Sequence, residues 1–138
     1  MPMATLGGRC YCRKLRFSVE GPVRNLCVCH CESCRRAAGA TFVAWGTVDD
    51  GCFHVLSGTL SLIRTTPEVQ RGFCDTCGTS LTYRHFRRSG EVDFTLVSLD
   101  DPTLLQPQAH IWVRDKLPWT EIADGLPQYQ TVPPDADA

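Results

Sequence analysis

The chain has 138 residues, of which 43% are hydrophobic and 21% charged, which is the size and composition of one globular domain. Its 14 Lys and Arg residues against 15 Asp and Glu give a net charge of −1, so no general positive field attracts nucleic acid or an anionic membrane. We therefore expect a single domain over residues 1–138, with a frayed or disordered tail at 130–138.

The predicted elements are mostly short strands. Residues 15–19 alternate apolar and polar side chains, the pattern of a half-buried strand, and Gly21-Pro22 ends them. Six more β-rich segments follow, at residues 42–45, 52–56, 60–63, 80–83, 92–97 and 110–113. Only residues 32–38, closed by Gly39, and a stretch near 118–122 are typical of a helical turn. This succession predicts an antiparallel all-β domain.

Nine cysteines are the most informative feature of the composition, and eight of them lie in tight clusters. The first residues have no basic and apolar leader, and no run approaches the roughly 20 apolar residues of a membrane span. We therefore expect a cytoplasmic protein without a membrane partner. In a reducing compartment clustered thiols are more often metal ligands than disulfides, and an odd number cannot form a complete disulfide framework.

Cys74 and Cys77 have the spacing of a zinc knuckle, followed by Gly78. A thioredoxin-like redox pair is the alternative, but that motif opens a helix, whereas residues 80–83 are predicted to form a strand. A closed zinc site needs four ligands, and Cys10 and Cys12 are the best source of the other two. In an extended segment their side chains point to the same face. The alternative for this pair is two buried free cysteines.

Cys29, Cys31 and Cys34 can place three thiols around a second metal ion. A closed site with Cys27 as fourth ligand is the alternative, but residues 27 and 31 of an extended strand lie about 13 Å apart. We therefore expect three protein ligands and one open position, which is the pattern of a catalytic zinc site. His30 alternates away from the thiols and is interpreted as a neighbouring or packing residue.

The remaining cysteines and histidines are expected to be structural. Cys27 and Cys52 have apolar neighbours and are predicted to be buried thiols. His54, His85 and His110 stand alone in strand-like segments, where hydrogen-bonded structural histidines are expected. Arg35 and Arg36 follow Cys34 and are candidates either for holding a substrate carboxylate or for a solvated helix end.

The order of these motifs resembles the glutathione-dependent formaldehyde-activating enzyme family, which also includes centromere protein V. The likeness covers about residues 7–129. It rests on G-x-C-x-C at 8–12, C-H-C-x-x-C-R-R at 29–36, G-A-x-F at 39–42, F-C-x-x-C-G-T at 73–79, L-D-D-P at 99–102, His110-Ile111, Trp119 and D-G-L-P at 124–127. Arg13 stands where the family usually has glycine after its second cysteine.

The resemblance implies an all-β fold of several short coiled sheets that holds two zinc ions. The structural ion would be bound by Cys10, Cys12, Cys74 and Cys77. The catalytic ion would be bound by Cys29, Cys31 and Cys34. The family's named activity is the addition of glutathione to formaldehyde, which gives S-hydroxymethylglutathione and is formally the reverse of a carbon–sulfur lyase reaction.

Three thiolates around Zn²⁺ leave a soft site that suits a fourth sulfur ligand. We therefore expect a zinc-dependent lyase-type enzyme whose partners are a small thiol such as glutathione and a small aldehyde. The alternative is a non-enzymatic zinc module that binds protein or nucleic acid, for which the basic segments at 84–88 and 13–16 are the support. A pI near 6.4 lies well below the values of about 9 or more that are typical of nucleic-acid-binding domains, so nucleic acid is not expected as a partner.

Overall fold

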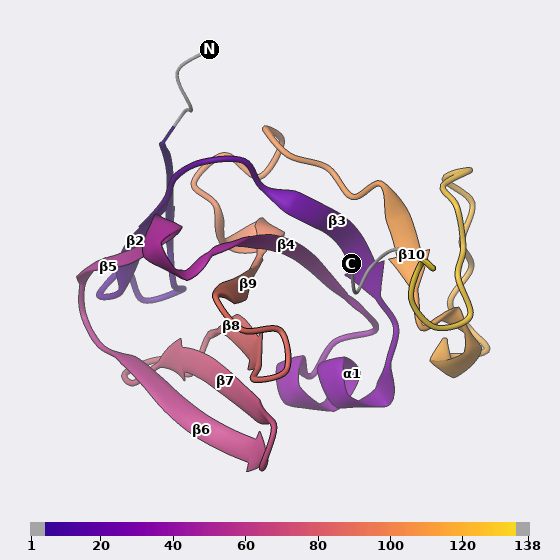
Figure 1. Cartoon of the computed structure of the whole chain (residues 1–138), viewed down its shortest axis with the longest axis horizontal. Helices are drawn as coiled ribbons and strands as arrows, with labels where there is room; N and C mark the ends of the chain where they lie inside the picture. The colour runs from indigo at the N-terminus through magenta and orange to yellow at the C-terminus, as the bar shows by residue number, and fades with distance from the viewer. Residues whose placement is uncertain (1–4, 135–138) are drawn as a thin grey trace.

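The computed structural model describes residues 5–134 and has a mostly β architecture, shown in Figure 1. Within that range ten strands form two sheets, and the longest helix, α1 (Glu32–Ala38), has seven residues. No helix of this part of the chain is long and apolar enough to cross a membrane. The predicted all-β fold class is confirmed.

The smaller sheet has three antiparallel strands in the order β1-β2-β5. Its strands are β1 (Leu6–Arg9), β2 (Arg16–Val19) and β5 (Phe53–Ser57). The larger sheet has seven strands in the order β10-β3-β4-β9-β8-β7-β6. Its strands are β3 (Arg24–Cys29), β4 (Val43–Asp49), β6 (Leu60–Thr66), β7 (Val69–Cys74), β8 (Ser80–His85), β9 (Glu91–Thr95) and β10 (Ala109–Ile111).

Most neighbours in the larger sheet are antiparallel, and the exception is β10, which pairs in parallel with β3. Three short 3-10 helices complete the secondary structure of the described residues, at Asp50–Cys52, Leu96–Ser98 and Val113–Asp115. In Figure 1 the larger sheet curves from β6 at the lower left to β10 at the right, and α1 follows β3 directly.

The seven predicted strand segments each overlap a strand, and α1 has the predicted bounds, with Gly39 in the left-handed conformation at its end. The stretch near 118–122 is not a helix but a turn, in which the N–H of Thr120 donates to the carbonyl of Leu117. Strands β1, β3 and β7 lie outside the seven predicted segments. In β7 the sequence VQRGFC places an arginine and a glycine at buried positions and breaks the usual alternation.

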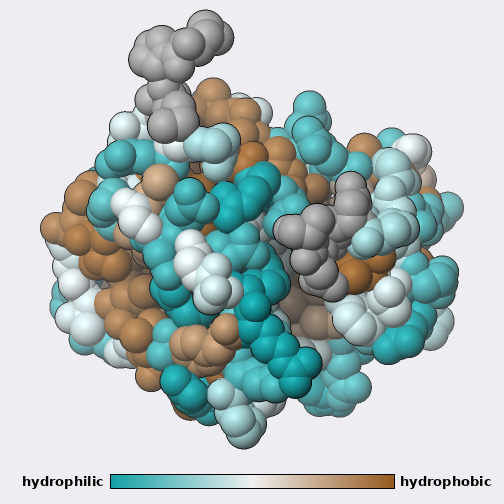
Figure 2. All heavy atoms as spheres, in the orientation of Figure 1, coloured by the Kyte–Doolittle hydropathy of each residue, from teal (hydrophilic) through white to brown (hydrophobic). Residues whose placement is uncertain are grey.

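The main core lies between the two sheets. Phe17 of β2 stacks on Phe53 with ring centroids 5.1 Å apart and also contacts Phe94 of β9. Cys10 and Cys74, each 1% exposed, belong to the same cluster of buried side chains. Apolar surface remains over β5 and β6, at the left of the face in Figure 2, where four side chains are exposed: Val55, Leu56, Leu62 and Ile63.

We expect Gly58→Ala to lower the free energy of unfolding by about 3 kcal/mol, measured by chemical denaturation. Gly58 has φ +76°, a conformation unfavourable for alanine. A Cβ there would lie 2.5 Å from the carbonyl oxygen of Lys14 and 2.7 Å from Cα of Leu15, and these backbone atoms can move away only if the chain shifts. Gly90→Ala is the matched control, because Gly90 has φ +82° but nothing within 4 Å of a Cβ. The control should cost about 1 kcal/mol. Equal losses of unfolding free energy in Gly58→Ala and Gly90→Ala would show that the backbone contacts at Gly58 add no destabilisation.

Candidate metal centres and the adjoining cavity

The first thiol cluster consists of Cys10, Cys12, Cys74 and Cys77, whose Sγ atoms all lie within 4.8 Å of one another. The sulfurs of Cys10 and Cys12 are 3.5 Å apart, well beyond the S–S bond of about 2.05 Å in a disulfide. Cys12 and Cys74 are 3.8 Å apart. The fold therefore brings together the two cysteine pairs that the sequence analysis joined.

One local prediction about this cluster was wrong. Cys10 and Cys12 were expected in an extended segment, but β1 ends at Arg9 and the pair lies in the turn that leads to β2. Arg13 in this turn has φ 74°, a conformation that suits glycine. Arg13 is also the position at which the family named in the sequence analysis usually has glycine. The turn brings the two sulfurs closer than the alternation of a strand would.

Backbone N–H groups point at the sulfurs of this cluster. The N–H of Leu15 donates to Cys10 Sγ at 3.4 Å, and the N–H of Cys77 donates to Cys74 Sγ at 3.5 Å. Hydrogen bonds from the side chain and backbone of Thr79 lower the pKa of Cys77 to about 5. Donors of this kind favour thiolates, and four thiolates at one point form the donor set of a closed tetrahedral metal site. The residues present therefore fit a structural ion such as zinc.

The second cluster consists of Cys29, Cys31 and Cys34, with Sγ atoms again within 4.8 Å of one another. Cys29 ends β3, Cys31 caps α1, and Cys34 lies in its first turn, where its N–H donates to Cys31 Sγ at 3.3 Å. Hydrogen bonds with the Cys29 and Cys34 thiols lower the pKa of Cys31 to about 2, and the pKa of Cys29 is raised in turn. The three thiols thus lie within reach of a single ion, and their donor set fits a soft metal ion.

Cys27 and His30 are not part of this cluster. Cys27 lies on β3 and lines the cavity described below, and burial raises its pKa to about 12. His30 is fully buried and contacts Phe42. Its side chain is held by other partners, so the described residues supply three clustered thiols here and no fourth sulfur or imidazole.

His30 belongs to a chain of three side chains. The carboxylate of Asp124 accepts a hydrogen bond from Nε2–H of His110 at 2.7 Å, which leaves Nδ1 of His110 to accept from Nε2–H of His30 at 2.9 Å. His110 is 5% exposed, and its bond lowers the pKa of Asp124. The chain ties the loop between Cys29 and Cys31 to β10 and to the segment that follows it.

The other two predicted structural histidines also have polar partners. Nε2 of His54 lies 3.1 Å from a carboxylate oxygen of Glu20, and Nδ1 of His85 accepts from the N–H of Arg87 at 3.2 Å. His110 was grouped with them, yet the structure places it one hydrogen bond away from the thiol loop. Its separation of 80 residues from His30 explains why no local pattern could indicate this.

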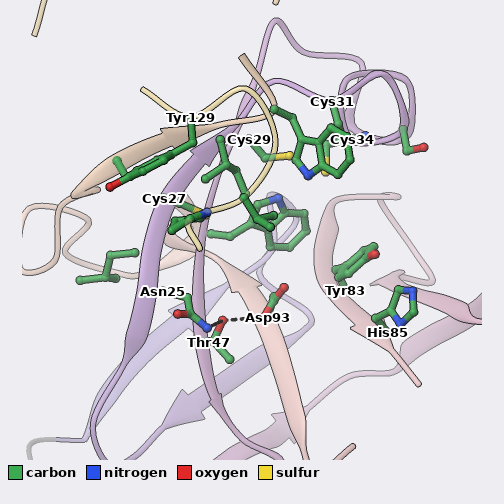
Figure 3. Close-up of a pocket in the computed structure, with 18 of the residues that line it drawn as sticks. Asn25, Cys27, Cys29, Cys31, Cys34, Thr47, Tyr83, His85, Asp93 and Tyr129 are labelled. Carbon is green, nitrogen blue, oxygen red and sulfur yellow. Dashed lines mark hydrogen bonds between the residues drawn. The ribbon is translucent and has the colours of Figure 1, made fainter. Parts of the chain in front are cut away.

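A cavity of about 730 Å³ adjoins the three-thiol cluster, and Figure 3 shows its lining. Cys29, Cys31 and Cys34 lie at one end. Polar side chains, among them Asn25, Thr47 and Asp93, lie at the other end. The lining also includes four aromatic side chains, Trp45, Tyr83, Trp112 and Tyr129. Figure 2 shows the face hollowed beside β3 and β4. A ligand whose sulfur joined the cluster would therefore extend along an aromatic wall towards a polar end.

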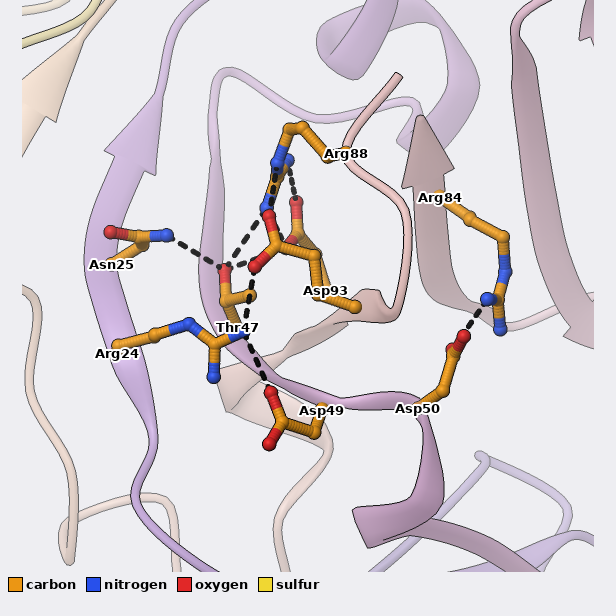
Figure 4. A network of polar contacts seen from close by, with 9 residues as sticks. Arg24, Asn25, Thr47, Asp49, Asp50, Arg84, Arg88 and Asp93 are labelled. Atoms are coloured by element: carbon orange, nitrogen blue, oxygen red, sulfur yellow. Dashed lines mark hydrogen bonds and ion pairs between the residues drawn. The ribbon is translucent and has the colours of Figure 1, made fainter. Parts of the chain in front are cut away.

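The polar end is an ion-pair network, shown in Figure 4. The guanidinium of Arg88 donates to both oxygens of Asp93, at 3.0 and 2.8 Å, and to Glu91 at 2.6 Å. The hydroxyl of Thr47 donates to Asp93 at 2.6 Å. Arg24 adds a second cation beside Glu91, at 2.6 Å. The charges of this end are satisfied within the protein.

The arginines that follow Cys34 do not line the cavity. Nε of Arg35 donates to the carbonyl of His30 at 3.2 Å, and Arg36 pairs with Glu32 at 2.8 Å. Arg71 of β7, which the sequence analysis did not single out, lines the cavity instead. It is 6% exposed, with Nη2 3.9 Å from Cys34 Sγ. Since β7 itself was not predicted, no local signal marked this residue.

The family described as glutathione-dependent formaldehyde-activating enzyme has a model that matches residues 5–115 of this chain. A crystal structure of a Rhodobacter sphaeroides protein, solved as a structural genomics target, superposes with a TM-score of 0.58 and 18% sequence identity. The match covers 90% of this chain and 99% of that one. At this identity the second comparison supports the fold alone.

Proposed function

We propose that this chain, which belongs to the glutathione-dependent formaldehyde-activating enzyme family, is a zinc-dependent carbon–sulfur lyase-type enzyme that acts on the adduct of a glutathione-like thiol and a small aldehyde. The matched residues 5–115 contain both thiol clusters. The observation that carries the proposal is the second cluster, in which three thiols, with no fourth clustered ligand among residues 5–134, adjoin a cavity large enough for a small molecule.

The two clusters have different roles in this proposal. Cys10, Cys12, Cys74 and Cys77 hold a structural zinc ion, and Cys29, Cys31 and Cys34 hold a catalytic one with one position open. When bound there, zinc supplies a soft Lewis acid that favours the deprotonated form of a substrate thiol. We further propose that the whole chain is a single domain and that it works in a reducing cytoplasm, where its thiols persist.

The chain's own residues orient and enclose the reactants. The rigid start of α1 fixes Cys31 and Cys34, and β3 fixes Cys29. The aromatic walls exclude water from the carbon atoms of the thiol and the aldehyde. In the forward direction the substrate sulfur forms a bond to the carbonyl carbon, the thiol proton leaves to water, and the aldehyde oxygen gains a proton. The reverse reaction breaks the same carbon–sulfur bond.

The binding-module alternative loses its main support in the structure. Within the basic segment 84–88, Arg84 pairs with Asp50, and Arg87 pairs with Glu68 at 2.6 Å. Arg88 is engaged with Glu91 and Asp93. Cations neutralised within the protein release few counterions from nucleic acid and contribute little to its binding. The enzyme hypothesis is therefore favoured over the binding module.

A thiol titration of the protein with Co²⁺ in both sites tests the proposal. Glutathione should enter the open position, and the d–d and thiolate-to-metal absorption bands should change saturably. Cys31→Ala should abolish the response, whereas Cys27→Ala, which removes a thiol outside the cluster, should keep it. Elemental analysis must first give two metal ions per chain. A silent titration in such protein would overturn the catalytic role and favour the binding module.

A further inference from the structure

The cavity beside the three thiols has one charged group that no carboxylate neutralises. Five of its lining residues carry a full charge, and four of these are paired: Glu32 with Arg36, Arg88 with Asp93, and Asp115 with Arg114. The fifth, Arg71, has no carboxylate oxygen within 4.0 Å in the described range 5–134. An anion that enters the cavity therefore finds one cation that is free to bind it.

A cation without a carboxylate partner is unusual at a position as buried as that of Arg71. Its side chain is almost fully enclosed, and transferring an unpaired charge from water to such a place is costly. Two neighbouring groups partly compensate the positive charge of Arg71. Nη2 lies 3.9 Å from Cys34 Sγ, and Cζ lies 4.8 Å from the centre of the Tyr83 ring, in cation–π contact. A guanidinium has five N–H donors, so these contacts leave donors for a further partner.

We infer that Arg71 determines the specificity of the site by binding a carboxylate of the thiol substrate while the substrate sulfur joins Cys29, Cys31 and Cys34. This inference rests on the proposed function. The planar fork of the guanidinium matches a carboxylate with two parallel hydrogen bonds. Because the guanidinium adjoins Cys34 Sγ, the carboxylate that it binds must lie close in space to the substrate sulfur.

Other arginines near the site are unsuited to this role. Arg88 already binds both oxygens of Asp93 as well as Glu91. Arg35 and Arg36 lie outside the lining of the cavity. Arg71 is thus the cationic partner that a desolvated substrate carboxylate would reach.

The experiment compares two thiols of the same shape, 3-mercaptopropionate and its neutral amide 3-mercaptopropionamide. Their affinities for the Co²⁺-loaded full chain are measured from the thiolate-to-metal absorption, without any turnover. Wild type should bind the acid about tenfold more tightly than the amide, because the charge-assisted pair forms only with the acid. In Arg71→Met the two affinities should become equal. Comparing both thiols in both proteins cancels the difference in their thiol acidity.

Two further variants separate the specific role from general effects. Arg64→Met removes the same charge from an exposed position outside the cavity, where the guanidinium donates to the carbonyl of Pro67 and not to a cavity-lining carboxylate, and should keep the tenfold ratio. Arg71→Lys keeps the charge but loses the fork, and should give an intermediate ratio even if Arg71→Met fails to fold.

Each outcome decides a separate question. An undiminished tenfold preference for the acid in Arg71→Met, or in Arg71→Lys if Arg71→Met fails to fold, would show that Arg71 only balances the charge of the three thiolates, and would overturn the inference. Equal binding of both thiols by wild type would overturn it as well, while leaving the open site intact. Failure of the two-metal wild type to bind either thiol would overturn the proposed function itself, and the inference with it.

Discussion

Cys77→Ala is expected to leave the protein unfolded or aggregated, whereas Cys31→Ala is expected to leave it folded. The first cluster joins the turn after β1 to the end of β7, and Cys12 and Cys74 are 62 residues apart in the chain. A closed zinc site contributes about 10–16 kcal/mol of apparent binding free energy, which equals or exceeds the net stability of about 5–15 kcal/mol of a typical domain. Loss of one ligand therefore removes most of the stability.

The second cluster differs because its three thiols come from one run of six residues, at 29–34. A metal ion there closes only a short loop, so its loss removes little constraint from the unfolded chain. Thermal melts of both variants, each with its metal content measured, distinguish the two cases. A comparable loss of stability in both would show that the second cluster is structural too.

Arg88→Met is expected to lower the free energy of unfolding by about 3 kcal/mol, because it leaves the carboxylate of Asp93 without its cation. The side chain of Asp93 is 12% exposed and that of Arg88 29% exposed, so water can replace little of the lost pairing. The cationic Arg24 remains beside Glu91, and Thr47 remains hydrogen-bonded to Asp93, which limits the loss.

The control for this prediction is Arg36→Met. Arg36 and Glu32 form an exposed pair one helical turn apart, with side chains 76% and 63% exposed. Such pairs contribute about 0.3–0.5 kcal/mol, and urea denaturation should show a loss of that size. If the two variants lost the same stability, the network in Figure 4 would be a surface feature and not part of the packed interior.

The sequence by itself determined the features that depend on near neighbours. Strand segments followed from alternation and turn residues, and α1 followed from residues 32–38 with Gly39 after them. Cysteine spacing grouped the thiols into a set of four and a set of three, because one or two intervening residues fix how close two sulfurs can come. The resemblance to the family depended on the same motifs and is confirmed over residues 5–115.

Only the tertiary structure decided what surrounds the three thiols. Arg71 reaches Cys34 across 37 residues of sequence, and His110 reaches His30 across 80. The first contact depends on the curved sheet that brings β7 towards α1, and the second on the parallel pairing of β10 with β3. Sheet order and register arise from the packing of the whole core, so a local pattern cannot encode them. For that reason the sequence pointed to Arg35 and Arg36 beside the ligands, while the fold brought Arg71 to the cavity.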